Sequence, residues 1–379
     1  MASSDLLEAA SRLHGYILIN HWDGRKLVGP DPVGKIHWRV TRFVRSYFPY
    51  LLGEDRYTFL QGQAYWIRAN LKLLKVAQKP QYLEFARRSA EYIVSAQAAD
   101  GHWLHPPIWG RRGFISTVEG VWASLGLAAV YRETRTDSYL DAARGWYKFQ
   151  VRGIGFQEVG DGLAANYYAH STRIVPNVTT MLIWLSAELF QITGDAAYLE
   201  PTEPMLRFVQ HCQLSTGELP YELGTRTHYL CYQYNSFEFL DLARYYQITG
   251  NEQMRPLLRR MAEYLATGVT ERGNCRHDCF KEFPEVNYWA ASLATALRKA
   301  HELALGDFFD LSERGYRHLL TQQRPDGGFD FSERNYRLLR DQRSYPRYLA
   351  MILDHLLERE RADVQGALPA VVGGTKSQA

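Results

Sequence analysis

A glycine that returns at a nearly constant interval is the feature that most constrains the fold of this chain. Glycines at positions 101, 155, 217, 273 and 327 follow one another at spacings of 54, 62, 56 and 54 residues. In the clearest copies an aromatic residue or histidine, an aliphatic residue and a glutamine precede the glycine, as in Tyr92, Ile93, Gln97, Gly101, Trp103 and in His318, Leu319, Gln323, Gly327, Phe329. A regular period of this length indicates a repeated supersecondary unit.

Each repeat has the pattern of a helical hairpin. An amphipathic stretch with apolar residues at i, i+3 and i+4 precedes each glycine, as in 308–323. An irregular loop and then a more apolar stretch follow it, as in 118–131 and 179–190. Thr-Gly-Asp at 193–195 and Thr-Gly-Asn at 249–251 connect an apolar helix to the next amphipathic one, because glycine suits the left-handed end of a helix. This alternation predicts a toroid with an inner and an outer ring of helices.

The number of hairpins follows from counting these segments. Five inner–outer pairs are predicted near 59–98, 116–152, 176–213, 234–268 and 284–323. An inner helix at 340–359 and the N-terminal helix at 4–20 remain, and together they can close a sixth hairpin, with 36–52 as an inserted helix. The fold is therefore predicted to be an all-α (α/α)6 barrel in one domain, residues 1–362, followed by a disordered tail, 363–379. Hardly any segment alternates with the period of a strand.

Composition excludes several classes of partner. The chain of 379 residues carries 44 Lys+Arg against 41 Asp+Glu, a net charge of +3, with the two signs interleaved. This balance does not favour binding to nucleic acid or to an anionic membrane surface. No apolar run reaches the roughly 18 to 20 residues of a membrane-spanning helix, and the N-terminus lacks the pattern of a signal peptide. We therefore expect a cytoplasmic protein without an integral membrane segment.

The loops that follow the outer helices are the longest in the chain, and in this topology they converge on one mouth of the barrel. They are rich in Trp, Tyr, His, Arg and carboxylates, which a loop that only connects helices does not need. Aromatic faces beside charged groups suit a polyhydroxylated ligand. The predicted ligand-binding residues are Trp103, Trp109, Arg112, Glu119, Tyr167, Tyr168, Arg276 and Arg343, and the predicted catalytic residues are Glu222, Tyr234, His277 and Asp278.

Several of these residues also have a structural interpretation. Trp103 occupies the same repeat position as Phe329 and can pack between hairpins instead of stacking on a ligand. Glu119 lies three residues after Ser116 and can complete a capping box. Glu222 lies in mid-loop, where no cap explains it.

Two further candidates have structural alternatives. Tyr234 lies near the start of an inner helix, where the nearby Glu238 can be a buried structural partner. Asp278 can adjust the charge of His277, or pair with Arg276 within the loop.

No cofactor or metal is predicted. Cys275 and Cys279 have an i, i+4 spacing with His277 between them, whereas zinc sites more often use Cys-x2-Cys or a His pair. Two buried thiols explain the spacing better. Glycine-rich phosphate loops and a Gly-x-Ser-x-Gly elbow are also absent from the sequence.

The repeats resemble two groups of helical toroids. The segments that end at Trp103 and Phe329 resemble the QW motifs of squalene cyclases and protein prenyltransferase β-subunits, and also the hairpin ends of six-hairpin glycosidases. The terpenoid acid and metal motifs are missing, although 278–282 (DCFKE) resembles the Asp-Cys-Thr-Ala-Glu motif of oxidosqualene cyclases. On the sugar side, 61–64 (QGQA), the acidic and aromatic stretch 220–234, and Arg276-His277 are similar, in the same order, to the C-terminal domain of glucuronyl C5-epimerases.

The sugar-side resemblance implies an enzyme acting on an oligosaccharide or polysaccharide that contains uronic acid. In an epimerase or lyase, Arg276 or Arg112 would hold the substrate carboxylate, and Tyr234 and His277 would exchange protons, with Glu222 as an alternative base. In a hydrolase, Glu222 and Asp278 would form the acid–base pair. Two alternatives remain at this stage: a terpenoid cyclase-like toroid with Asp278 as proton donor, and a non-catalytic toroid that binds glycan or protein.

Overall fold

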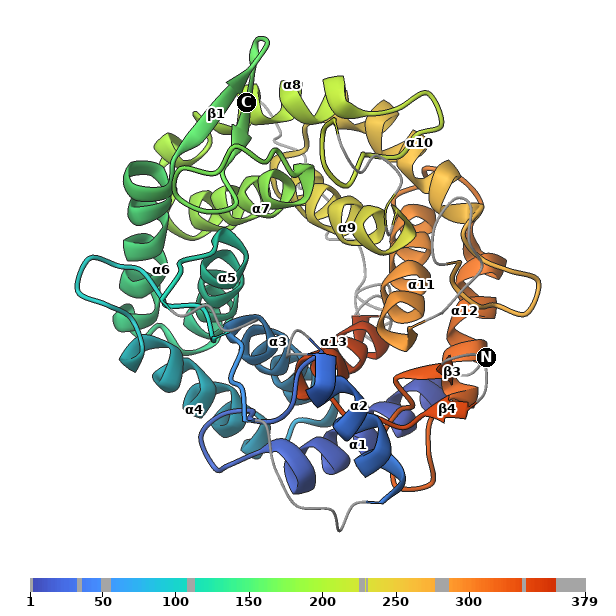
Figure 1. Cartoon of the computed structure of the whole chain (residues 1–379). Coiled ribbons are helices and arrows are strands. Elements are labelled where there is room, and N and C mark those ends of the chain that lie inside the picture. Colours follow the sequence, from blue (N-terminus) through green and yellow to red (C-terminus); the bar gives the residue numbers. More distant parts are fainter. Residues whose placement is uncertain are drawn as a thin grey trace, which may run out of the picture.

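The computed structural model of the chain describes residues 3–32, 36–48, 56–107, 113–224, 229, 231–276, 286–335 and 339–358. The helices form two concentric rings (Figure 1). The inner ring consists of α3 (Leu60–Ala77), α5 (Thr117–Thr134), α7 (Pro176–Thr193), α9 (Cys231–Thr249), α11 (Asn287–Glu302) and α13 (Pro346–Leu356). The outer ring consists of α4 (Gln81–Ser95), α6 (Asp137–Phe149), α8 (Thr202–Cys212), α10 (Arg255–Ala266), α12 (Phe309–Thr321) and α1 (Ser3–His21).

The inner ring is closed. Each inner helix packs against the next in chain order, and α13 packs against α3 to complete the circle. The N-terminal helix α1 packs against α13 and supplies the outer helix of the sixth hairpin, while α2 (Ile36–Tyr47) is the inserted helix. The predicted (α/α)6 barrel, and its closure by the N-terminal helix, are thus confirmed, with helix limits within a few residues of the expected ones.

In the described part of the chain, strands and short helical turns lie between the long helices. The antiparallel hairpins β1–β2 (Phe156–Val159 and Gly162–Ala165) and β3–β4 (Ser332–Asn335 and Leu339–Asp341) both lie in loops that lead from an outer to an inner helix. The remaining turns are η1 (Gln150–Ile154), η2 (Ala196–Tyr198) and η3 (Glu252–Met254). The sequence analysis did not expect these strands, because segments of three or four residues are too short to establish a period of two.

The repeat glutamine connects neighbouring hairpins. In three copies its amide nitrogen donates both to the carbonyl of the repeat glycine and to a carbonyl of the next outer helix. Gln97 bonds Gly101 O and Ala142 O, each at 2.8 Å. Gln213 and Gln323 repeat this arrangement, and Gln323 reaches Ala9 O of α1 at 2.8 Å. One residue type therefore fastens consecutive hairpins and also joins the last outer helix to the first.

We expect Gln323→Ala to loosen the closure of the ring. The substitution leaves the carbonyls of Ala9 and Gly327 without this donor, which we expect to lower the free energy of unfolding by about 1–3 kcal/mol. Hydrogen exchange should become faster in α1 than in the other outer helices. Gln253→Ala, at an exposed glutamine, is the control. Unchanged protection of α1 would contradict this role.

The inner-to-outer turns follow the local chemistry that was expected. Gly194 ends α7 in a left-handed conformation, at φ +72°, and its N–H bonds Phe190 O at 2.8 Å. Asp195 then accepts from the N–H of Ala197 at 3.0 Å and starts the next turn. Among the described helices none is long and apolar enough to cross a membrane. The expected tail at 363–379 lies outside the described residues.

Candidate active site at the front of the barrel

All six inner helices begin at the same end of the toroid, which we call the front mouth. The helices of the inner ring run in one direction, since each is reached through an outer helix that runs back. Residues in their first turns therefore meet around one opening, although they are far apart in the sequence. They include Gln61 of α3, Glu119 of α5, Tyr234 of α9, Tyr288 of α11 and Arg347 of α13.

Aromatic side chains form a nearly continuous lining of the front mouth. From one side, ring contacts link Phe59 to His105 (5.5 Å between centroids), His105 to Phe114 (4.2 Å), Phe114 to Tyr168 (5.4 Å) and Tyr168 to Tyr167 (4.5 Å). From the other, the guanidinium of Arg347 lies over Phe59 at 4.4 Å and over Tyr348 at 4.7 Å, and Tyr348 stacks on Tyr288 at 4.0 Å. Tyr221 meets Tyr234 at 4.7 Å and Tyr229 at 5.1 Å.

Tyr234 joins the two arcs of this lining. Burial raises the pKa of Tyr234 well above its ordinary value, and the neighbouring Tyr221, Tyr167 and Tyr288 raise it further. The phenol is therefore held in its protonated form at neutral pH. A half-buried phenol that keeps its proton can donate a hydrogen bond, or the proton itself, to a group bound in the mouth.

A buried ion pair organises the floor beside the tyrosines. The side chain of Arg347 contacts Asp31 through Nε (2.9 Å) and Nη2 (2.9 Å), and it also donates to Gln61 and to the hydroxyl of Tyr348. Burial alone would lower the pKa of Arg347, but Asp31 and its other neighbours raise it, so the guanidinium stays charged. Arg347 thereby links α13, α3 and the segment after α1 at the mouth.

Glu119 caps a helix other than its own. Its Oε2 accepts from the N–H groups of Leu60 (2.6 Å) and Gln61 (3.3 Å), which are unpaired donors at the start of α3. The capping box with Ser116 that the spacing suggested is therefore wrong in detail, since Ser116 makes no side-chain cap. Burial raises the pKa of Glu119 to about 7, against the opposing effects of Arg347 and the two N–H groups.

The raised pKa of Glu119 predicts that the free energy of unfolding differs between the parent and a Glu119→Gln variant, and that this difference depends on pH. A raised pKa means that Glu119 stabilises the fold fully below about pH 4.5, and that this contribution is lost as the pH rises through about 7. Glu119→Gln keeps an acceptor for the cap but cannot ionise. We expect the variant to match the parent at about pH 5 and to exceed it by on the order of 2 kcal/mol at about pH 8.

Denaturant unfolding of both proteins at the two pH values measures this difference. Burial lowers the pKa of four histidines to about 4: His14, His21, His105 and His355. Their effect on stability is the same in parent and variant and cancels in the difference. Glu84→Gln, at an exposed carboxylate paired with Arg88, serves as the control. An equal stability difference at both pH values would contradict the shifted pKa.

Glu222 is engaged in a bidentate ion pair. Nε and Nη2 of Arg173 donate to Oε1 and Oε2 of Glu222 at 2.8 and 2.6 Å. Glu222 is buried, whereas the Arg173 side chain is 53% exposed. This pairing favours the ionised carboxylate, so Glu222 is poorly suited to give up a proton as a general acid. Arg173, which the sequence analysis did not single out, places a partly exposed cation at the mouth.

Two predicted ligand-binding residues need correction. Trp103 is only 1% exposed, its indole N–H donates to Ile93 O at 2.8 Å, and its ring lies 5.9 Å from that of Trp146. It packs between hairpins, as Phe329 does in the core. The guanidinium of Arg343 makes a bidentate contact with buried Asp341 and lies over Phe331. Neither side chain is presented to a ligand in this structure.

Tyr167 and Tyr168 belong to the aromatic lining, and their role in ligand binding stays a prediction. Arg276 is half-buried, and its backbone N–H bonds Gly268 O at 2.8 Å. The predicted residues Trp109, Arg112, His277 and Asp278 lie outside the described residues. Within the described part of the chain, no cluster of three or more His, Cys, Asp or Glu could hold a metal ion.

Several residues of the mouth were not predicted from the sequence. The charged ones and those beside them on the inner helices are Asp31, Arg173, Tyr288, Arg347 and Tyr348. Aligning the first turns of the predicted inner helices would have indicated the last three, because helix starts in a toroid share one end. Asp31 lies in an irregular segment and Arg173 in a long loop, and no periodic signal marks either position.

The comparisons with known proteins agree on the architecture. No family model matches the chain, and no curated protein matches its sequence. Among solved structures, a cellobiose 2-epimerase from Bacillus thermoamylovorans B4167 superposes with a TM-score of 0.75 at 13% identity, covering 94% of this chain and 100% of that one. The chain folds as a six-hairpin (α/α)6 toroid.

Two further structures extend the same similarity. A polysaccharide lyase (BACCELL_00875) gives a TM-score of 0.69 at 14% identity over 97% of this chain and 99% of that one. A possible member of glycoside hydrolase family 105 from Salmonella enterica gives 0.70 at 13% identity, over 96% and 95%. The similarity spans nearly the whole length of each chain, so the six-hairpin resemblance read from the repeats is confirmed at the level of fold.

Proposed function

We propose that the protein is a carbohydrate-active enzyme that binds a uronic-acid-containing glycan in the front mouth and moves a proton at the carbon next to the substrate carboxylate. The observation that carries this proposal is the aromatic lining that surrounds the protonated phenol of Tyr234. Ring faces pack against the C–H faces of sugars, while tyrosine hydroxyls bond their hydroxyl edges. An opening with this composition suits a glycan better than an isoprenoid, which offers no hydrogen-bonding groups along its chain.

Removal of a proton next to a carboxylate requires a base, a proton donor and a cation. Tyr234 is the proton donor of this proposal, since its phenol carries a proton at neutral pH and lies beside Tyr221 at the start of α9. Arg173, with a side chain 53% exposed, supplies the cation for the substrate carboxylate, together with Arg276. His277 is the proposed base, with Asp278 adjusting its charge. Glu119 acts as a positioning residue because it holds the start of α3.

Similar structures support acid–base chemistry on sugars in this fold. These structures include a polysaccharide lyase and two sugar epimerases as well as glycoside hydrolases. Lyases and epimerases share proton removal as a step, whereas hydrolases need a pair of carboxyl groups, one protonated and one ionised. The bidentate contact with Arg173 suits Glu222 to the ionised role in such a pair and not to that of the acid.

The test is incubation of the protein with uronate oligosaccharides in deuterated water. We expect either deuterium at C5 of a saturated product, as in epimerisation, or an unsaturated uronate, as in β-elimination. New reducing ends without either change would overturn proton removal in favour of hydrolysis. Thermal stabilisation by the glycan without any turnover would indicate a binding module, and stabilisation only by isoprenoid diphosphates would favour the terpenoid alternative.

A further inference from the structure

A second cavity opens at the opposite end of the barrel, where the inner helices end. We call it the rear chamber. It has a volume of about 380 Å³, and all six inner helices contribute to its wall. Arg68 lies seven residues after Gln61 on α3, and Asp354 seven residues after Arg347 on α13. At 1.5 Å per helical residue, each chamber residue is about 10 Å from its counterpart at the front mouth.

A layer of aromatic side chains forms the floor of the rear chamber. Tyr65 stacks on Trp122 at 4.2 Å, and Trp122 meets Trp184 edge-to-face at 5.7 Å. His355 lies 6.1 Å from Tyr65 and 6.3 Å from Phe237. These five residues come from α3, α5, α7, α9 and α13. The apolar floor lowers the local dielectric constant, which strengthens the interaction of nearby charges with a ligand.

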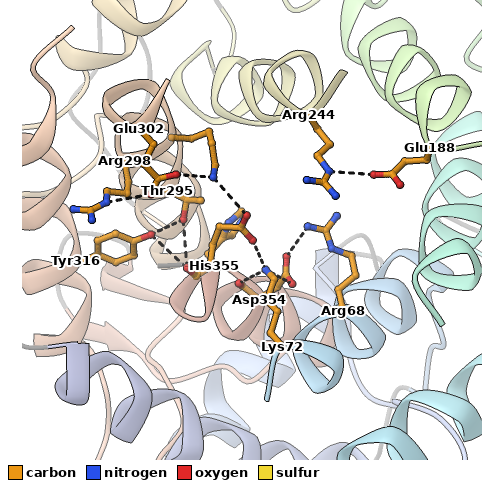
Figure 2. A network of polar contacts seen from close by, with 12 residues as sticks. Arg68, Lys72, Glu188, Arg244, Thr295, Arg298, Glu302, Tyr316, Asp354 and His355 are labelled. Atoms are coloured by element: carbon orange, nitrogen blue, oxygen red, sulfur yellow. Dashed lines mark hydrogen bonds and ion pairs between the residues drawn. The ribbon is translucent and has the colours of Figure 1, made fainter. Parts of the chain in front are cut away.

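Charged side chains also line the chamber, which we call its collar, and Figure 2 shows how Arg68, Arg244 and Glu188 lie. Arg68 pairs with Asp354 at 3.2 Å and lies over Trp184 at 4.8 Å. Arg244 contacts Glu188 through Nε at 3.1 Å, and Lys72 contacts Asp354 at 2.7 Å and Glu358 at 2.6 Å. The complete set of lining cations is Arg68, Lys72, Lys75, Arg132, Arg244 and Lys299, and the carboxyl groups are Glu133, Glu188, Asp241, Asp354 and Glu358.

The charges of the collar favour the binding of an anion. Burial raises the pKa of Asp241 well above its ordinary value, which favours its neutral form and leaves the cations in excess. Five buried polar atoms of residues lining the chamber have no hydrogen-bond partner among the described residues: Nη1 of Arg68, Nε1 of Trp122, Nε2 of His355, Oε2 of Glu188 and Oδ1 of Asp354. The two carboxylate oxygens lie within ion-pair distance of Arg132 and Lys72. The unsatisfied groups that remain are therefore nitrogen atoms.

We propose that the rear chamber is a second ligand site, which binds a hydroxylated anion of monosaccharide size. Its carboxylate or phosphate lies between the guanidinium groups of Arg68 and Arg244, and its ring packs against the aromatic floor. A cavity of this volume admits a single sugar ring. This site is separate from the front mouth and does not depend on the function proposed there.

Titration of the full-length protein, followed by calorimetry and tryptophan fluorescence, tests the site. The probes are glucose 6-phosphate, glucuronate and uncharged glucose. We expect the charged sugars to bind and to change the emission of Trp122 and Trp184, and glucose to bind much more weakly. Comparison of the phosphate with the carboxylate identifies which oxyanion the site prefers. Binding of glucose as tight as that of the charged sugars, or no binding of either anion at about 10 mM, would overturn the proposal.

Variants assign the binding to the rear chamber. Arg244→Met removes one guanidinium and leaves Glu188 its contact with Arg132, so we expect a stable fold and an affinity weaker by about tenfold or more. Gln247→Glu adds a carboxylate at the exposed rim of the chamber and should also weaken binding without disturbing the core. Arg207→Met removes an arginine of α8 that pairs with Asp161 at 3.4 Å, outside the chamber, and should leave the affinity unchanged.

The two proposals fail independently. Loss of charged-sugar binding in Arg244→Met and Gln247→Glu supports the rear site, whatever the protein does to a glycan. Unchanged affinity in both variants would place the binding elsewhere and overturn the rear site. Conversely, absence of exchange at C5 would contradict the function proposed for the front mouth, but it would not affect the conclusion drawn from these titrations about the rear chamber.

Discussion

Replacing Tyr234 with phenylalanine is expected to lower the turnover of the uronate substrate by about 10²- to 10⁴-fold, the usual contribution of a positioned proton donor. The phenyl ring keeps the edge-to-face contact with Tyr221, whose centroid lies 4.7 Å away. We therefore expect KM and the free energy of unfolding to change little. The loss should appear in kcat, because only the transferable proton has been removed.

A tyrosine on the same helix provides the matched control. Tyr246 lies twelve residues beyond Tyr234 on α9, and its hydroxyl donates to Glu252 at 2.7 Å, away from the mouth. Tyr246→Phe removes the same atom from the same helix and should leave turnover unchanged. Steady-state kinetics and thermal unfolding of both variants make the comparison. Turnover near the parental value in Tyr234→Phe would remove Tyr234 from the catalytic assignment.

The second large effect concerns the repeat glycine. Gly217 has φ +102°, and a Cβ added there would lie 2.3 Å from the carbonyl oxygen of Arg260 on α10. Gly217→Ala must therefore adopt a strained backbone and also push the outer helix away. We expect the free energy of unfolding to fall by about 3–5 kcal/mol, since strain and overpacking each cost roughly 1–3 kcal/mol. Denaturant unfolding measures this loss.

Two other glycines with positive φ separate the cost of backbone strain from the cost of overpacking. Gly155 occupies the same repeat position in a degenerate copy, at φ +74°, but the nearest atom to its added Cβ is 3.9 Å away. Gly194 is left-handed, at φ +72°, and nothing lies within 4 Å. Gly155→Ala and Gly194→Ala therefore introduce backbone strain without a collision, and we expect smaller losses, about 1–2 kcal/mol for Gly194→Ala. Equal losses in all three variants would show that close approach of the next hairpin is not the reason for the repeat glycine.

The close approach explains why this glycine could be recognised in the sequence. In the copies at Gly101, Gly217, Gly273 and Gly327, an added Cβ would meet a carbonyl oxygen of the next outer helix at 2.3 to 2.6 Å. The repeat glutamine bonds the same junction. The glycine makes this close approach in four of the five copies and the glutamine bonds the junction in three, so their spacing counts the hairpins. The degenerate copy at Gly155 precedes the β1–β2 hairpin, and no atom of the next outer helix lies within 4 Å of its added Cβ.

The site was less accessible to sequence reasoning because its contacts join different helices. Local spacing suggested that Glu119 caps its own helix with Ser116, yet the carboxylate reaches the start of α3, 59 residues earlier. Glu222 was expected to be a catalytic carboxyl, and 49 residues separate it from the arginine that holds it. A sequence pattern does not show which side chains meet across such separations. That depends on how neighbouring hairpins are rotated around the ring.

What the sequence determined by itself was therefore the architecture: the repeat glycine and glutamine, the alternation of apolar and amphipathic helices, and a sixth hairpin closed by the N-terminal helix. These are properties of one hairpin and its junction with the next, and each leaves a local pattern. Only the tertiary structure decided that Trp103 packs in the core, that Asp31 pairs with Arg347 and that a charged chamber lies behind the aromatic floor. Those features arise where six helix ends meet, and closure of the ring, not the local sequence, brings them together.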